Sequence, residues 1–269
     1  MGAFAAPSQR ESVMTQVDVS ELRDKVKAMY RAVAEQPRGM FHFELGQDLA
    51  LRLGYPGDEL SRVPPEAVES FAGVGYHLGL AAIVPGERIV DLGSGSGMDL
   101  FLAARQAGAG GTAVGIDMTD EQIAKARRLA ARDGYRTVRV EQGYIEHASI
   151  ADGWADVIIS NGVINLCEDK AAVFQEISRM LRPGGRAAIS DIVTERQLTE
   201  AIVCDVTLWA SCIGGAMQQQ DYRRAMEDAG LQLLEARENT QYHFISDSAR
   251  GATVTFGVKS ISVLTAKRS

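Results

Sequence analysis

The sequence is poor in cysteine, in basic charge and in long apolar runs, and each shortage excludes a class of protein. Its three cysteines, Cys167, Cys204 and Cys212, cannot form a paired disulfide framework or a CxxC metal knuckle. A reducing cytoplasm is the expected compartment, and we interpret Cys167 and Cys204 as small buried side chains. Lys and Arg number 28 against 35 Asp and Glu, so the basic footprint of a nucleic-acid binder is missing. No apolar run is long enough to span a bilayer. We predict no nucleic-acid partner, no membrane partner and no metal site, and the composition leaves the oligomeric state open.

What is present is an ordinary globular composition, 46% hydrophobic and 23% charged. The length allows one large α/β domain with a small cap. Residues 18–36 predict a helix with one apolar face, and residues 40–82 are mixed. We predict that 1–82 is an N-terminal helical cap segment and that 83–269 is the main domain.

From residue 85 onwards, short apolar strands alternate with helices. The predicted strands are 88–92, 112–117, 136–142, 155–160, 186–191, 231–237 and 259–266. Helices are predicted after the first and second strands, at 169–181 and near 219–229, and Thr119 with Gln122 predicts a capping box for the second of them. Short connections between strand and helix imply right-handed crossovers and a mostly parallel sheet covered on both faces. The predicted fold class is a doubly wound α/β fold.

Three glycines, Gly93, Gly95 and Gly97, lie between the first strand and the helix that follows it. Glycine permits positive φ there and lets a ligand approach the backbone. The glycine turn alone is also compatible with a plain strand-to-helix connection. Asp117 ends the second strand, about 20 residues further on, where a carboxylate can bind both hydroxyls of a ribose. Together these features favour an adenosine-type cofactor.

Charge distinguishes two such cofactors. A dinucleotide places its pyrophosphate at the helix N-terminus, where the carboxylate of Asp91 would repel it. S-adenosylmethionine has no phosphate and carries a cationic ammonium and a cationic sulfonium, which a nearby carboxylate suits. Met98 also stands where a G-x-G-x-x-G pattern has its third glycine. Both features favour S-adenosylmethionine over NAD.

These motifs together resemble the class I S-adenosylmethionine-dependent methyltransferases. The resemblance rests on residues 91–97 (DLGSGSG), on Asp117 and on residues 181–185 (LRPGG). It implies a Rossmann-like, seven-stranded sheet whose last strand is inserted antiparallel, with S-adenosylmethionine as the cofactor. The cofactor-binding residues predicted on this basis are Asp91, Gly93, Ser94, Gly95, Gly97, Asp117, Met118, Ile145, Glu146 and Asn161.

A narrower resemblance is to the arsenite methyltransferases, in residues 160–166 (SNGVINL), 190–193 (SDIV) and 212–216 (CIGGA). In that family, three cysteines hold arsenic. The first lies in the motif that ends the fourth strand, the second lies ahead of the first strand, and the third opens the motif C-x-x-G-A. Here Gly162 occupies the first place, residues 73–80 contain no cysteine, and Cys212 alone matches. Because trivalent arsenic needs several converging thiolates, an organic acceptor is favoured. An arsenite or methylarsenite methyltransferase with a reduced cysteine set is the alternative.

Methyl transfer from a sulfonium depends on positioning and desolvation, so a general base is optional. His77 is the candidate base, and a structural histidine is the competing interpretation. The candidates for lining the acceptor pocket are Tyr30, Tyr76, Trp209 and Cys212. We therefore predict a cytoplasmic methyltransferase with a small-molecule methyl acceptor. The other class considered, a nicotinamide-dependent oxidoreductase or a non-catalytic nucleotide-binding module, is opposed by Asp91 and Met98.

Overall fold

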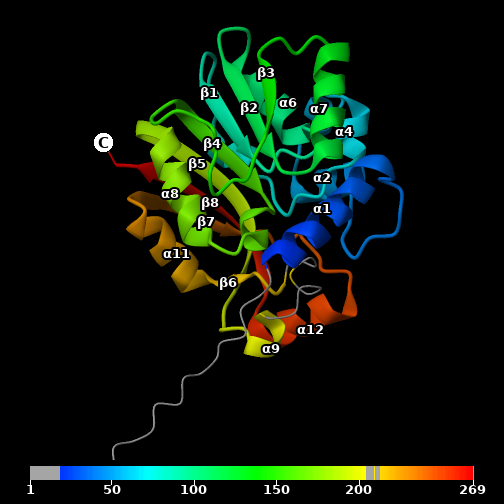
Figure 1. Cartoon of the computed structure of the whole chain (residues 1–269), viewed down its shortest axis with the longest axis vertical. Helices are drawn as coiled ribbons and strands as arrows, with labels where there is room; N and C mark the ends of the chain where they lie inside the picture. The colour runs from blue at the N-terminus through cyan, green and yellow to red at the C-terminus, as the bar shows by residue number, and fades with distance from the viewer. Residues whose placement is uncertain (1–18, 204–208, 210–212, 269) are drawn as a thin grey trace, which may run out of the picture.

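Eight β-strands form one sheet through the centre of the computed structural model, which describes residues 19–203, 209 and 213–268 (Figure 1). Their order is β3-β2-β1-β4-β5-β8-β7, and β6 pairs with β5 off this path. The strands are β1 (Arg88–Leu92), β2 (Thr112–Asp117), β3 (Val138–Gln142), β4 (Ala155–Asn161), β5 (Leu181–Thr194), β6 (Met217–Gln218), β7 (Leu231–Glu238) and β8 (Lys259–Lys267). The Rossmann-like fold class predicted from the sequence is confirmed.

The pairing of β8 departs from the parallel pattern of the first five strands. β8 runs antiparallel to both β5 and β7 and lies between them. This is the inserted last strand that the resemblance implied. The additional strand β6 contributes two residues, and it makes the sheet eight-stranded.

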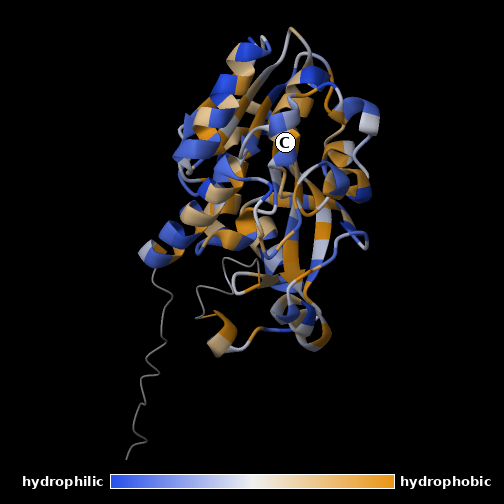
Figure 2. Ribbon diagram, turned by 90° about the vertical axis from the view of Figure 1, so that its right-hand side faces the viewer, coloured by the Kyte–Doolittle hydropathy of each residue, from blue (hydrophilic) through white to orange (hydrophobic). Residues whose placement is uncertain are grey.

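Helices cover both faces of the sheet because the strands alternate buried side chains between the faces. Ile89 packs with the side chains of α6 (Met98–Ala107) and α7 (Asp120–Arg132), whereas Val90 packs with those of α8 (Lys170–Met180) and α11 (Gln219–Asp228). Figure 2 shows apolar residues along the strands and polar residues on the outer surfaces of the helices. Further helices within the described residues are α2 (Gly46–Leu53), α3 (Gly57–Leu60), α4 (Pro65–Glu69), α5 (Leu78–Ala81), η1 (Ile164–Leu166), α9 (Glu200–Val203) and α12 (Asp247–Phe256).

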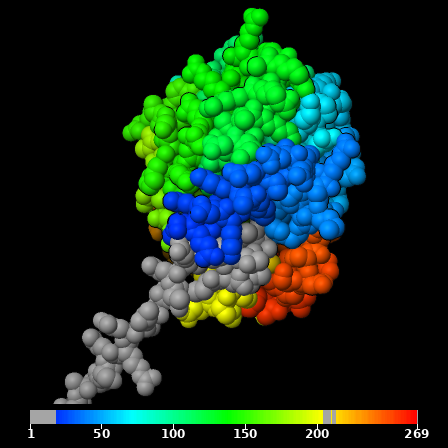
Figure 3. Space-filling view, turned by 45° about the vertical axis from the view of Figure 1, so that its right-hand side comes forward, coloured from blue at the N-terminus to red at the C-terminus, as the bar shows by residue number. Residues whose placement is uncertain are grey.

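The N-terminal helix α1 (Val19–Glu35) lies against α7. Its apolar face is buried at Leu22, Val26 and Val33. Lys125 of α7 donates to the carbonyl of Ala34 at 3.1 Å. In Figure 3, the blue N-terminal residues form a band between the green part of the molecule and the orange C-terminal part. The division into an N-terminal cap segment and a main domain, with its boundary at residue 82, stays a prediction.

The structure differs from the predicted elements mainly where local signals were weak. β5 begins at Leu181, so the Pro183-Gly184-Gly185 turn lies inside the strand beside a register irregularity in its pairing with β4. α12 contains Gly251 and several β-branched residues and was not predicted; its N-cap is Ser246, whose hydroxyl accepts from the amide of Ala249. Within the described ranges, every helix is too short or too polar to cross a bilayer.

Candidate functional site

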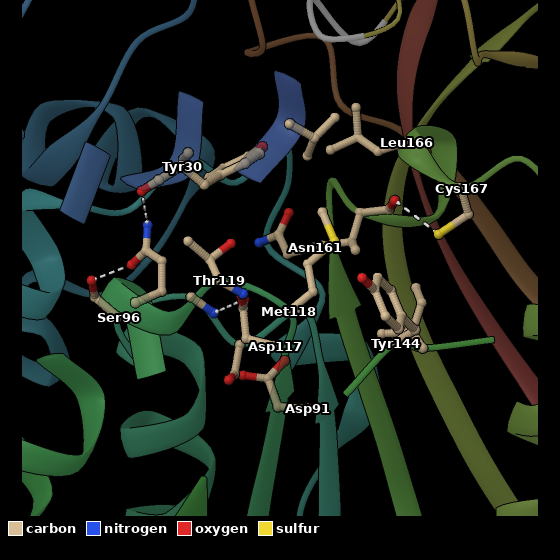
Figure 4. A pocket seen from close by; sticks show the side chains of 18 of the residues that line it. Tyr30, Asp91, Ser96, Asp117, Met118, Thr119, Tyr144, Asn161, Leu166 and Cys167 are labelled. Carbon is tan, nitrogen blue, oxygen red and sulfur yellow. Dashed lines mark hydrogen bonds between the residues drawn. The ribbon is translucent and has the colours of Figure 1, made fainter. Parts of the chain in front are cut away.

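A cavity opens at the carboxyl ends of β1, β2 and β4, beneath α1 (Figure 4). It holds about 1110 Å³ of space between protein atoms, part of which is open to solvent. All ten predicted cofactor residues line it: Asp91, Gly93, Ser94, Gly95, Gly97, Asp117, Met118, Ile145, Glu146 and Asn161. Parallel α/β sheets bind ligands at this edge, so the sequence motifs and the cavity coincide.

The glycine loop is folded closely against the ends of two strands. The amides of Gly93 and Ser94 donate to the carbonyl of Ile116 at 2.8 and 3.0 Å. Gly93 has φ +72°, and a Cβ at this position would clash with Val163. A glycine is therefore required here, both for the backbone conformation and for the approach of the loop after β4.

Asp117 joins this loop to the end of β2. Its two carboxylate oxygens accept from the amides of Gly95 and Thr119, each at 2.8 Å. Burial raises the pKa of Asp117, while these backbone hydrogen bonds oppose the increase. Each carboxylate oxygen keeps a second lone pair, which suits the two hydroxyls of a ribose.

Asp91 is the buried group that indicates a cationic ligand. It is 2% exposed, and its Oδ2 has no hydrogen-bond partner among the described residues. Burial raises its pKa well above the usual range, and Asp99 and Asp117 raise it further by charge repulsion. All three carboxylates line the cavity. The ammonium of S-adenosylmethionine would compensate this charge, whereas a pyrophosphate would add to it. The residues present therefore fit S-adenosylmethionine.

The side chain of Gln122 connects three parts of the site. It accepts from the hydroxyl of Ser96 and donates to the carbonyl of Tyr30 at 2.9 Å. The predicted capping box of α7 is therefore wrong, because Thr119 makes no side-chain cap and Gln122 bonds to the glycine loop and to α1 instead. A long-range contact has displaced the local one.

Asn161 lines the cavity, but its amide is engaged by protein groups. Its Oδ1 accepts from the amide of Val74 at 2.8 Å, and its Nδ2 donates to Asp99 at 3.1 Å and to the carbonyl of Gly75 at 3.0 Å. Tyr55 also donates to Asp99, at 2.6 Å. The sequence analysis did not identify Asp99, although its place two residues after Gly97 was a usable signal.

Charged side chains of α1 close the cavity over the loop that follows β3. Arg23 forms an ion pair with Glu146 at 3.4 Å. The Arg23 guanidinium lies 4.5 Å from the centroid of the Tyr144 ring, and Lys27 donates to the Tyr144 hydroxyl at 3.0 Å. These partners were not predicted because the contacts join residues more than 100 positions apart.

The acceptor candidates are only partly brought together. Tyr30 lines the cavity, whereas Tyr76 and Trp209 do not. Tyr76 packs against Tyr55 with ring centroids 4.7 Å apart. Cys212 lies outside the described residues. Cys167, which we interpreted as a small buried side chain, lines the cavity, and burial raises the pKa of its thiol.

His77 immediately precedes α5 and is not part of the cavity lining. Its side chain is fully buried, and neither ring nitrogen has a hydrogen-bond partner among the residues that the structure describes. Burial lowers the pKa of the imidazole, although Asp99 opposes the effect. This position does not bring the predicted general base to the cavity.

The lowered pKa of His77 makes a prediction about acid stability. On acidification, the His77 imidazole gains a proton in the unfolded chain before it does so in the folded protein. The contribution of His77 to the free energy of unfolding therefore falls as the pH drops below about 6.5. We expect His77→Gln to lose less stability than the wild type between pH 7.5 and 5.5, as measured by urea unfolding. His147→Gln, a change at an exposed histidine, should keep the wild-type slope. Equal slopes for the wild type and His77→Gln would contradict the prediction.

The buried carboxylate of Asp91, whose Oδ2 has no hydrogen-bond partner among the described residues, predicts opposite effects on stability and on binding. Because the folded state raises the pKa of Asp91, the unfolded chain releases this proton first. The cost to stability therefore grows as the pH rises above the ordinary aspartate pKa and is complete above the raised one. We expect Asp91→Asn to raise the Tm of the ligand-free protein at pH 8 and to leave it nearly unchanged in acid. The same change should weaken S-adenosylmethionine binding about 10-fold or more in calorimetry. A lower Tm at pH 8 would show that Asp91 is stabilised by other groups.

Removal of the Asp117 carboxylate tests the ribose assignment. We expect Asp117→Ala to weaken S-adenosylmethionine binding by about 1.5–3 kcal/mol, as for hydrogen bonds to a charged group. Isothermal titration calorimetry measures this effect, and circular dichroism verifies the fold. Asp58→Ala removes an exposed carboxylate and should leave the affinity unchanged. Wild-type affinity in Asp117→Ala would refute the assignment.

Comparisons with known proteins agree with this site. A family model described as "Methyltransferase domain" matches residues 83–230. The arsenite methyltransferase of Halobacterium salinarum is 34% identical over 255 residues, which are 89% of this chain and 65% of that protein. The arsenite methyltransferase of Aquipseudomonas alcaligenes is 41% identical over 179 residues, 64% of this chain and 51% of that protein. The chain thus spans between half and two thirds of the length of these relatives.

A solved structure supports the same assignment. The arsenic(III) S-adenosylmethionine methyltransferase from Chlamydomonas reinhardtii has 32% sequence identity and a TM-score of 0.67, with 79% of this chain and 72% of that chain covered. These matches favour a methyltransferase over a nicotinamide-dependent oxidoreductase or a non-catalytic nucleotide-binding module. The chain belongs to the S-adenosylmethionine-dependent methyltransferases, and it is close to the arsenite methyltransferases.

Proposed function

We propose that this protein transfers the methyl group of S-adenosylmethionine to a small acceptor bound in the cavity beside the glycine loop. The observation that carries the proposal is the unpartnered Oδ2 of Asp91 in a cavity shared with Asp99 and Asp117. Such a surplus of buried negative charge complements a cationic cofactor. Because the chain spans only part of its relatives, activity and acceptor are both proposals.

The cofactor, when bound, supplies an activated methyl group on a sulfonium. The chain's own residues orient it and exclude water. Asp117 and Asp91 flank the glycine loop, and Leu22, Val26 and Tyr30 of α1 close the cavity with apolar surface. A dry cavity favours a displacement in which charge is dispersed. The described lining thus provides positioning and desolvation without a histidine.

The similarity to arsenite methyltransferases favours trivalent arsenic as the acceptor. It supports an arsenite or methylarsenite methyltransferase with a reduced cysteine set over the organic acceptor that the sequence alone favoured. One specific observation agrees: Cys167 lines the cavity, five residues after Gly162. We propose that Cys167 and Cys212, together with a free thiol such as glutathione, hold the arsenic. Each thiol that binds arsenous acid replaces one hydroxyl group on the arsenic, and the thiol proton leaves with that hydroxyl as water. Burial raises the pKa of the Cys167 thiol, and this exchange lets the thiol bind without net release of a proton.

An organic acceptor is the second candidate, supported by the packing around Gly162. A Cβ built at Gly162 would lie 3.3 Å from Cγ1 of Val74. Val74 is 2% exposed and belongs to an apolar cluster with Leu166 and Trp209. Leu22, Val26 and Leu166 of this cluster line the cavity, and an apolar lining of this kind suits an organic molecule better than a soft ion.

Arsenite turnover with S-adenosylmethionine and glutathione separates the two acceptors. We expect methylated arsenic as the product and at least a 10-fold loss of kcat/KM in both Cys167→Ser and Cys212→Ser. Cys204→Ser is the matched control and should retain wild-type activity. If the wild type binds S-adenosylmethionine but does not methylate arsenite, the arsenic proposal fails and organic acceptors become the candidates.

A further inference from the structure

Lys170, the first residue of α8, is a buried cation that the proposed chemistry does not use. It is 4% exposed. Its Nζ donates to the carbonyl of Cys167 at 2.6 Å and lies 4.8 Å from the ring centroid of Trp209. In the part of the chain that the structure describes, no carboxylate lies within ion-pair distance of it. Burial of an ammonium is costly, so its retention needs a reason.

The two partners of Lys170 belong to different segments. Cys167 lies in the loop between β4 and α8 and lines the cavity, whereas Trp209 precedes the Gly214-Gly215 pair. The two segments are tightly packed, because a Cβ at Gly215 would clash with the carbonyl of Asn165 and with the Trp209 ring. The ammonium therefore sits where these segments meet.

The same loop is held from the sheet by Asp191 of β5. Its Oδ1 accepts from the amides of Asn165 and Ile192 at 3.3 and 2.8 Å, and its Oδ2 accepts from the hydroxyl of Tyr222 at 3.0 Å. Asp191 thus fixes the backbone of the loop at Asn165, and Lys170 fixes it two residues later at Cys167. Together, Asp191 and Lys170 hold the backbone of the loop after β4 from Asn165 to Cys167, and Cys167 forms part of the cavity lining.

We propose that Lys170 is a positioning residue of the acceptor site, which clamps the carbonyl of Cys167 to the ring of Trp209 and so fixes the wall against which the acceptor binds. The inference rests on the proposed function, because it assigns the wall that contains Cys167 to the acceptor. A cation over an aromatic face is favourable and directional, particularly when both are desolvated. An apolar side chain of similar length would fill the volume without fixing either partner.

Lys170→Met is the informative variant because buried charges are often replaced by apolar residues without loss of stability. We expect it to keep the wild-type Tm, to leave the Kd for S-adenosylmethionine within about 2-fold and to raise the KM for arsenite about 10-fold. Lys170→Arg, which retains the charge and both kinds of contact, should restore at least part of the acceptor affinity. Lys267→Met is the matched control. Lys267 also donates to a backbone carbonyl, that of Leu181 at 2.9 Å, but at the opposite edge of the sheet.

A second readout does not depend on turnover. In a Trp154→Phe background, Trp209 is the remaining tryptophan, and we expect Lys170→Met to increase the acrylamide quenching of its fluorescence at unchanged Tm. Unchanged quenching, or equal losses of acceptor and cofactor affinity, would overturn the inference. If the wild type methylates no acceptor, the proposed function fails. The role of Lys170 in acceptor binding then fails as well. The quenching result then still decides whether the clamp exists.

Discussion

Repulsion between carboxylates at the carboxyl ends of the central strands is the constraint on which the site depends. Asp91, Asp99 and Asp117 line one cavity without a cation among the described residues that pairs with Asp91. A parallel sheet concentrates such groups because neighbouring strands end together. Folding has to overcome this repulsion, and ligand binding relieves it. Affinity for the cofactor and stability of the ligand-free protein are therefore opposed in this molecule.

Hydrogen bonds from surrounding segments keep these carboxylates in place. Asn161 and Tyr55 hold Asp99, and the amides of Gly95 and Thr119 hold Asp117. Each of these bonds also fixes a neighbouring segment, such as the glycine loop. The electrostatic strain is thus distributed through a connected network, which explains why residues far apart in the sequence determine one site.

The parts of the site that could be predicted are those encoded by short segments. β1 and β2 have the predicted bounds because each is a brief run of β-branched and apolar residues that is buried on both faces. The glycine loop and Asp117 follow from the same two strands. The contacts of Arg23, Gln122 and Cys167 could not be predicted, because each depends on how α1 or the loop after β4 lies in three dimensions. His77 was a candidate by residue type, and only its burial shows that it lies away from the cavity.

The contact between Gly162 and Val74 also bears on how acceptor preference can change. Gly162 has φ +72°, a conformation that costs a non-glycine residue about 1–2 kcal/mol. A side chain gained at this position would also meet Val74. The amide of Val74 donates to Asn161, and its carbonyl accepts from the hydroxyl of Ser260. The two positions are therefore epistatic. A smaller residue at 74 removes the steric part of the cost of a side chain at 162 but not the backbone part, so substitutions at the two positions have a preferred order.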